Sequence, residues 1–248
     1  MTKLYLLAGV SIGVLPNIAT ALPLYEMRWA ANGEVEYVQR DNDVQTPQQG
    51  FHAYDNWRPS EFGGNTNLAL GTRFRMGGDE FADDLFMTTT GPALFTDFAF
   101  TIANTSQTQR LQSVWLTNRI YDTNRVLLFA DARRISISIA PATAIGIYSN
   151  SNVYTRYGVI LPPHIYVSMQ FSDAVGVDSA DVGCLLPGPR TTGYSTQFAY
   201  NFTTGQALNF DGTDQTNMAF FVDTANVPSP GPAAALFAAS PLLLRRRR

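Results

Sequence analysis

The feature that most constrains this chain is a series of short segments in which apolar residues alternate with small or polar ones. Side chains of a β-strand point to opposite faces in turn, so a period of two predicts strands with one apolar face. Turn-forming clusters separate these segments, and no stretch shows a convincing helical period. The alternating positions are Phe98, Phe100 and Ile102; Ile135, Ile137 and Ile139; Ile165, Val167, Met169 and Phe171; Phe198, Tyr200 and Phe202; and Met218, Phe220 and Val222.

The alternation predicts an all-β fold, a jelly-roll-like β-sandwich over residues 68–226. In such a sandwich one face of each strand fills the core and the other meets water. The preceding segment, residues 22–67, is mixed: Glu34–Gln39 alternates like a strand, whereas Asp41–Pro59 is polar. The sequence leaves open whether residues 22–67 join the sandwich or form a separate cover.

The beginning of the chain has the features of a signal peptide over residues 1–21. Lys3 supplies a positive charge, residues 4–15 are an apolar core, and an Ala-Thr-Ala site ends at Ala21. This pattern predicts export and cleavage by signal peptidase, which would leave Leu22 first. A buried strand is the alternative interpretation.

The last segment, residues 227–248, combines three features in order. Val227, Pro228 and Pro230 begin a proline-rich stretch through which neither helix nor sheet can continue. An apolar stretch, 233–244, and four arginines follow. Such a helix would rise about 18 Å, short of the roughly 20 residues that a full membrane span needs. The arginines fit the cytoplasmic side of a membrane; a disordered tail is the alternative.

This order of features, a proline-rich stretch, an apolar stretch and an arginine cluster, resembles the PEP-CTERM sorting signal of bacterial surface proteins. The motif of that signal is Val-Pro-Glu-Pro. Ser229 stands where that family has Glu, and Pro241 interrupts the helix. The resemblance implies transient anchoring in the inner membrane, removal of the signal by an exosortase-type sorting enzyme, and delivery to the cell surface or outside it.

The middle of the chain also resembles a group of exported bacterial β-sandwich proteins that carry PEP-CTERM ends. The residues that carry this resemblance are Gly78-Asp79-Glu80, Phe98-Ala99-Phe100 and Gly183-Cys184-Leu185-Leu186. The resemblance implies a jelly-roll-like fold and no particular activity.

The charge balance argues against nucleic acid as a partner. Lys3 and Arg245–Arg248 are five of the 17 basic residues, so trimming both ends leaves 12 against 20 acidic residues, a net charge of −8. An acidic surface without a basic patch repels a phosphate backbone.

Four carboxylates fall within six residues, at Asp79, Glu80, Asp83 and Asp84. Oxygen ligands suit Ca²⁺, so these residues are candidates for a structural calcium site, and a solvated acidic loop is the alternative.

The string Gly77–Phe81 also spells the signature of diguanylate cyclases. That family has an Asp-x-Asp-x-Phe-Lys segment upstream and long helices, which this sequence lacks. We therefore interpret the string as a turn before a strand, with the two glycines at positive φ.

No residue pattern points to catalysis, and we expect no enzymatic activity. His52 and His164 are the only histidines, and neither accompanies a nucleophile signature. Cys184 is the only cysteine and is expected to be a small buried residue without a disulfide.

We consider three functions, of which we expect the first, and the other two are alternatives. The first is a non-catalytic structural or interaction protein of the bacterial surface or matrix. The second is a carbohydrate-binding module that binds extracellular polysaccharide, for which Tyr54 and Trp57 in the polar segment are candidate stacking residues; packing in the core is their alternative use. The third is a surface hydrolase, because paired carboxylates need only be close in space.

Overall fold

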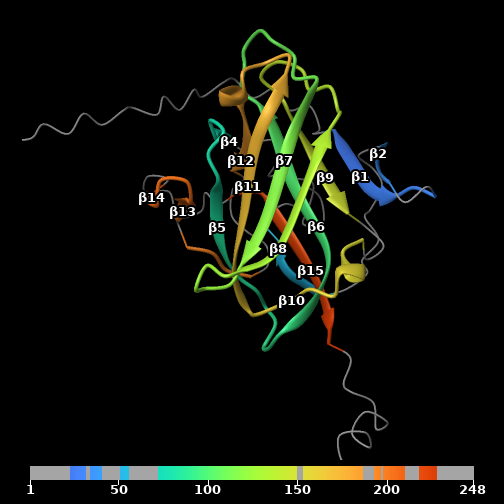
Figure 1. Cartoon of the computed structure of the whole chain (residues 1–248), viewed down its shortest axis with the longest axis vertical. Helices are drawn as coiled ribbons and strands as arrows, with labels where there is room; N and C mark the ends of the chain where they lie inside the picture. The colour runs from blue at the N-terminus through green and yellow to red at the C-terminus, as the bar shows by residue number, and fades with distance from the viewer. Residues whose placement is uncertain are drawn as a thin grey trace, which may run out of the picture.

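The computed structural model of the chain describes residues 23–31, 34–40, 51–55, 72–149, 153–186, 193–196, 198–209 and 218–227. Within these ranges the chain forms two β-sheets and two single-turn 3₁₀ segments, η2 (Thr155–Tyr157) and η3 (Ser179–Asp181). In Figure 1 the strands β7, β8 and β11 lie in front of β6 and β15, so the two sheets are stacked face to face. The predicted all-β sandwich is confirmed.

The larger sheet has nine strands, with the main order β2-β1-β9-β6-β12-β4. In addition, β10 and β15 pair with β6, and β3 pairs with β15. Its strands are β1 (Leu24–Trp29), β2 (Val35–Arg40), β3 (Phe51–Asp55), β4 (Thr72–Arg75), β6 (Ala93–Asn104), β9 (Ala144–Ser149), β10 (Ile160–Leu161), β12 (Val182–Leu186) and β15 (Phe220–Asn226).

The smaller sheet has six strands in the order β14-β13-β5-β11-β7-β8. All its pairings are antiparallel. Its strands are β5 (Phe81–Phe86), β7 (Ser113–Tyr121), β8 (Leu127–Ile135), β11 (His164–Val175), β13 (Phe198–Asn201) and β14 (Gln206–Asn209).

From β4 onward the chain passes repeatedly from one sheet to the other. The strands β4, β6, β9, β10, β12 and β15 belong to the larger sheet, and those between them belong to the smaller one. Repeated crossing between two stacked sheets is the arrangement of a jelly roll, and from β4 onward all pairings between these strands are antiparallel.

The early strands answer the question that the sequence leaves open about residues 22–67. Strand β1 pairs antiparallel with β2 and parallel with β9, and β3 pairs antiparallel with β15. The described parts of this segment therefore belong to the larger sheet and do not form a separate cover.

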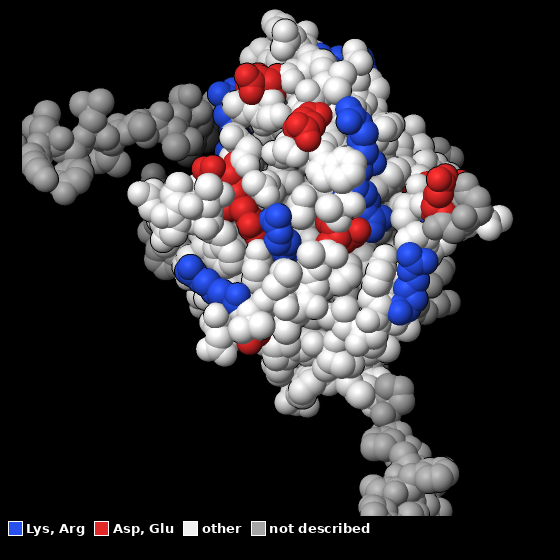
Figure 2. All heavy atoms as spheres, viewed as in Figure 1, with Lys and Arg blue, Asp and Glu red and all other residues white. Residues whose placement is uncertain are grey.

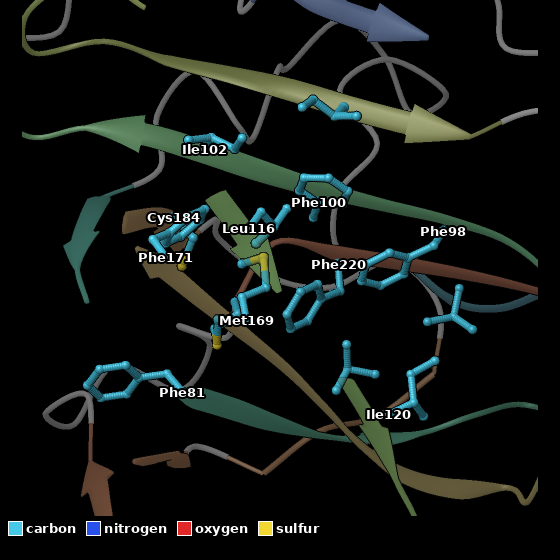
Figure 3. Close-up of a cluster of buried hydrophobic side chains, with 14 of the residues drawn as sticks. Phe81, Phe98, Phe100, Ile102, Leu116, Ile120, Met169, Phe171, Cys184 and Phe220 are labelled. Carbon is cyan, nitrogen blue, oxygen red and sulfur yellow. The ribbon is translucent and has the colours of Figure 1, made fainter. Parts of the chain in front are cut away.

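The core fills the space between the sheets, as Figure 3 shows for side chains that reach inward from both of them. On β11 the predicted inward residues, Ile165, Val167, Met169 and Phe171, are all fully buried. Phe98, Phe100 and Ile102 on β6 and Phe220 on β15 meet them from the larger sheet. Cys184 lies in the same core and is a free thiol, as expected.

Strand β13 follows the predicted alternation, but Tyr200 does not face the core. Ala199 and Asn201 are the buried residues, whereas Tyr200 is partly exposed on the outer face. The cause is the register, because Ala199 pairs with the inward-facing Asp83 of β5 and Tyr200 pairs with Ala82. Residues opposite each other on paired strands lie on the same face.

Several sequence predictions fall outside the described residues. They include the signal peptide with Ala21, the candidate Trp57, and the C-terminal signal with Pro228 and Pro230; Val227 is the last described residue. In the part of the chain that the structure describes, no helix has the length and apolar character needed to cross a membrane.

Candidate functional site on the outer face of the smaller sheet

A row of seven rings crosses the outer face of the smaller sheet, the face turned away from the core. We call this row the aromatic strip. It lies over β7, β5, β11 and β13 and the segments that adjoin them. Its members are Tyr194, Phe86, His164, Tyr166, Tyr200, Phe202 and Tyr121.

Strand register brings these rings together. His164 on β11 lies opposite Phe86 on β5, and Tyr166 lies opposite Tyr121 on β7. Side chains at such opposite positions share a face and lie within contact distance. Residues far apart in the sequence therefore become neighbours on one surface.

A close backbone approach places Tyr194 at one end of the strip. Tyr194 and Phe86 exchange two backbone hydrogen bonds, of 2.6 and 2.9 Å. The preceding residue, Gly193, has φ of +77°, and a Cβ there would lie 2.8 Å from a ring carbon of Tyr54. Only glycine fits both this conformation and this space.

The rings form a continuous set of contacts. Phe86 stacks on His164 with 3.7 Å between ring centroids, and the other neighbouring centroids along the strip are 5.1–5.8 Å apart. Edge and tilted contacts at these distances are the favourable arrangements for aromatic pairs. The seven rings therefore form one continuous aromatic surface.

The strip remains accessible to solvent. Tyr194 is 48% exposed, and the other six residues are partly exposed. None of the seven belongs to the core clusters. Exposed apolar patches on soluble proteins can mark interaction sites, so the strip is the candidate functional site.

A polar network flanks the strip around Glu80. One carboxylate oxygen accepts hydrogen bonds from the Tyr121 hydroxyl at 2.8 Å and the Ser168 hydroxyl at 2.6 Å, and the other forms an ion pair with Arg119 at 2.9 Å. Burial and the neighbouring Glu80 raise the pKa of Tyr121 to about 12, so its hydroxyl stays protonated. Arg119 also donates to Gln170 at 3.2 Å.

Asp84 lies on the same sheet face as the strip and is close to His164, one of the strip's members. The buried Asp84 accepts hydrogen bonds from the backbone N–H and the hydroxyl of Thr196, at 3.0 and 2.7 Å, and burial raises its pKa above the usual value. Burial lowers the pKa of His164, and the nearby Asp84 partly opposes this shift. The sheet therefore favours a neutral imidazole beside Phe86.

The four acidic residues that were candidates for calcium do not share one site. Asp79 accepts from the Asn201 side chain at 2.8 Å, and Asp83 points into the core and accepts from the Met218 N–H at 2.9 Å. Glu80 and Asp84 face the opposite side of the sheet, because alternate residues of a strand point in opposite directions. The described residues contain no group of three or more His, Cys, Asp or Glu arranged to hold a metal ion.

The turn before β5 agrees with the sequence interpretation. Gly77 and Gly78 have φ of +63° and +85°, and the strand begins at Phe81. The two glycines therefore supply the positive φ angles that the reversal of the chain requires.

Tyr54, a candidate for stacking on a sugar, is buried. It is 0% exposed, and its hydroxyl lies 3.3 Å from the Ser195 hydroxyl. A sugar in solvent cannot reach this ring, so the prediction of a binding role for Tyr54 is wrong. Tyr54 sits on β3 of the larger sheet, and its packing in the core is the alternative that the sequence also allowed.

The strip was not predicted from the sequence, where the candidate stacking residues Tyr54 and Trp57 lie in the polar segment Asp41–Pro59. A usable signal was present: His164 and Tyr166 occupy the outward positions of a strand whose inward positions are all aliphatic or aromatic. The partners of these rings on β5, β7 and β13 follow only from the register, which the sequence does not specify.

Charge is scattered over this face. Figure 2 shows Arg and acidic side chains in small separate groups, with large uncharged areas between them and no broad field of one sign.

Comparison with known protein families, with curated proteins and with solved structures finds no match.

Proposed function

We propose that this protein is an exported, non-catalytic β-sandwich that binds an extracellular polysaccharide through the aromatic strip. The observation that carries the proposal is the continuous set of seven partly exposed rings on one sheet face. The C–H faces of pyranose rings are apolar and pack against aromatic faces, while their hydroxyl groups need hydrogen-bonding partners at the edge. Export and surface sorting rest on the sequence features of the two chain ends.

The surroundings of the strip suit such a ligand. The hydroxyl groups of Tyr194 and Tyr200 belong to the same face, and a tyrosine hydroxyl can donate to and accept from sugar hydroxyls. Neighbouring rings are spaced at 3.7–5.8 Å, and their row is longer than one sugar ring. An extended chain of several sugars therefore fits the strip better than a single sugar does.

The polar groups support binding over hydrolysis. Glu80 is held by Tyr121, Ser168 and Arg119, and Asp84 is held by Thr196. The four contacts engage both carboxylates with donors of the protein itself. A hydrolytic pair would instead need two carboxyl groups directed at one glycosidic bond.

The test is binding of the protein to an array of extracellular oligosaccharides, followed by calorimetry with the best ligand. Tyr166→Ala, at the centre of the strip, is expected to weaken binding about tenfold, on the order of 1.4 kcal/mol. Trp115→Ala is the matched control, because Trp115 is 39% exposed on the same sheet face and has no ring contact with the strip. Equal loss in the two variants, or binding to no glycan, would contradict the proposal.

A further inference from the structure

Arg125 stands at one end of the aromatic strip, in the turn that joins β7 to β8. Its guanidinium carbon lies 4.8 Å from the centroid of the Phe202 ring. This cation–π contact holds the charge over the strip and leaves the side chain exposed.

The other arginines of the described residues all have a polar partner. Arg28, Arg40, Arg75, Arg119 and Arg133 form ion pairs with carboxylates. Arg73, Arg110, Arg134 and Arg156 form hydrogen bonds to a carbonyl or a hydroxyl oxygen. Among the described residues, Arg125 alone has neither an ion pair nor a side-chain hydrogen bond.

The turn holds Arg125 in a conformation that disfavours its residue type. Its φ is +62°, in the left-handed region, which residues with a Cβ rarely adopt. Asp122 accepts three backbone hydrogen bonds within the turn. Its carboxylate accepts from the N–H groups of Asn124 and Val126, both at 2.8 Å, and its carbonyl accepts from the N–H of Arg125 at 2.9 Å. Unfavourable backbone conformations that a turn enforces in this way concentrate at functional sites.

We propose that Arg125 binds an anionic group of the polysaccharide, so that the ligand of the strip is an acidic glycan such as a uronic-acid polymer. This inference rests on the proposed glycan binding. The planar guanidinium matches a carboxylate in a two-point contact, and the described residues leave all five of its N–H donors unused. The aromatic strip would stack on the sugar rings while Arg125 selects for their charge.

The acidic balance of the whole chain does not oppose this contact. At physiological ionic strength, charges more than about 8 Å apart are largely screened. The nearest carboxylate in the turn, Asp122, is not in ion-pair contact with Arg125 and accepts two backbone hydrogen bonds. Glu80, which accepts from Tyr121 at the same end of the strip, forms its ion pair with Arg119 and not with Arg125.

The experiment uses pairs of oligosaccharides that differ only in charge: glucose, galactose and mannose oligomers and the corresponding uronic-acid oligomers. We expect the protein to bind one acidic member about tenfold more tightly than its neutral counterpart, with a preference that shrinks as salt rises. Arg125→Gln is expected to abolish this preference and to keep binding to the neutral member. Arg110→Gln removes the same charge from an exposed residue outside the strip and is expected to keep the preference.

The outcomes separate the two proposals. Binding to neutral and acidic members alike, unchanged in Arg125→Gln, would overturn the role of Arg125 and leave glycan binding intact. Loss of the preference in Arg110→Gln as well would show that total charge is responsible and not this residue. Binding to no member of any pair would overturn both proposals.

Discussion

The two faces of strand β11 differ, because one fills the core and the other carries the proposed binding surface. The inward residues Ile165, Val167, Met169 and Phe171 are fully buried and belong to the main core. The outward residues are His164, Tyr166, Ser168 and Gln170, which combine rings with polar atoms. One face would contribute to folding by excluding water, and the other keeps apolar surface where a ligand can reach it.

The comparison shows why aromatic residues must be assigned face by face. Phe171 and Tyr166 lie five residues apart on the same strand, yet Phe171 is fully buried and Tyr166 contacts Tyr200 and Phe202 at the surface. The apolar content of the strand does not distinguish these two uses. What distinguishes them is the larger sheet, which packs against the inward face and leaves the outward face toward solvent.

The largest expected effect comes from emptying the inward face. Phe171→Ala should lower the free energy of unfolding by about 3–5 kcal/mol, because it removes buried apolar surface and leaves a cavity. Denaturant unfolding would measure the change. The neighbouring outward residue is the control, and Ser172→Ala should change the free energy by less than about 0.5 kcal/mol. Similar losses in both variants would contradict the division between the two faces.

The two adjacent aspartates of β5 offer a second comparison of the faces. Asp83→Ala should destabilise the protein by about 2 kcal/mol, because the buried N–H of Met218 would lose its acceptor. Asp84→Asn keeps an acceptor for Thr196 and removes a charge that burial disfavours, so it should be neutral or stabilising at pH 7. Thermal unfolding of the two variants would test this prediction. A larger loss of stability in Asp84→Asn than in Asp83→Ala would contradict the assignment of faces.

A smaller effect concerns pH. Burial holds the pKa of His164 below its ordinary value of 6.5, so the unfolded chain takes up a proton more readily than the folded protein does. Stability from this residue is therefore complete above about pH 6.5 and declines as the pH falls below it.

His164→Phe keeps a ring against Phe86 and removes the titration. Its unfolding free energy relative to wild type should rise as the pH is lowered from about 7 to about 5. The raised pKa of Asp84 acts in the opposite direction, favouring the folded state at lower pH, but it is present in both proteins. A difference that stays flat across this range would show that His164 is not desolvated in the folded protein.

The sequence predicted the parts of the fold that depend on local alternation. The period of two along Phe98–Ile102 and Ile165–Phe171 identified β6 and β11 and their buried residues, because the pleat of a strand fixes which side chains share a face. The Gly77-Gly78 turn was predictable for a similar reason, since positive φ favours glycine. The assignment of early residues to the larger sheet depends on long-range pairing with β9 and β15, which no local pattern specifies.

The candidate site was much less predictable. Its neighbours Phe86, Tyr121, His164 and Phe202 are brought together from four segments by strand register and by the turn after β13. The pleat of β5 places Asp83 and Asp84 on opposite faces of the sheet, so these neighbours in the sequence do not share one site. Tyr54 illustrates the converse, because a polar segment surrounds it in the sequence while its strand buries it.

The most direct test of the aromatic strip as a binding surface is an NMR titration of the protein, with labelled aromatic side chains, against the best glycan of the array. The account predicts shifts that concentrate on Tyr166, Tyr194, Phe202 and Tyr121, with Phe98, Phe171 and Phe220 of the core unchanged. Shifts centred instead on Trp29 and Tyr157 beside Arg156, or no shifts at glycan concentrations that saturate binding, would contradict it.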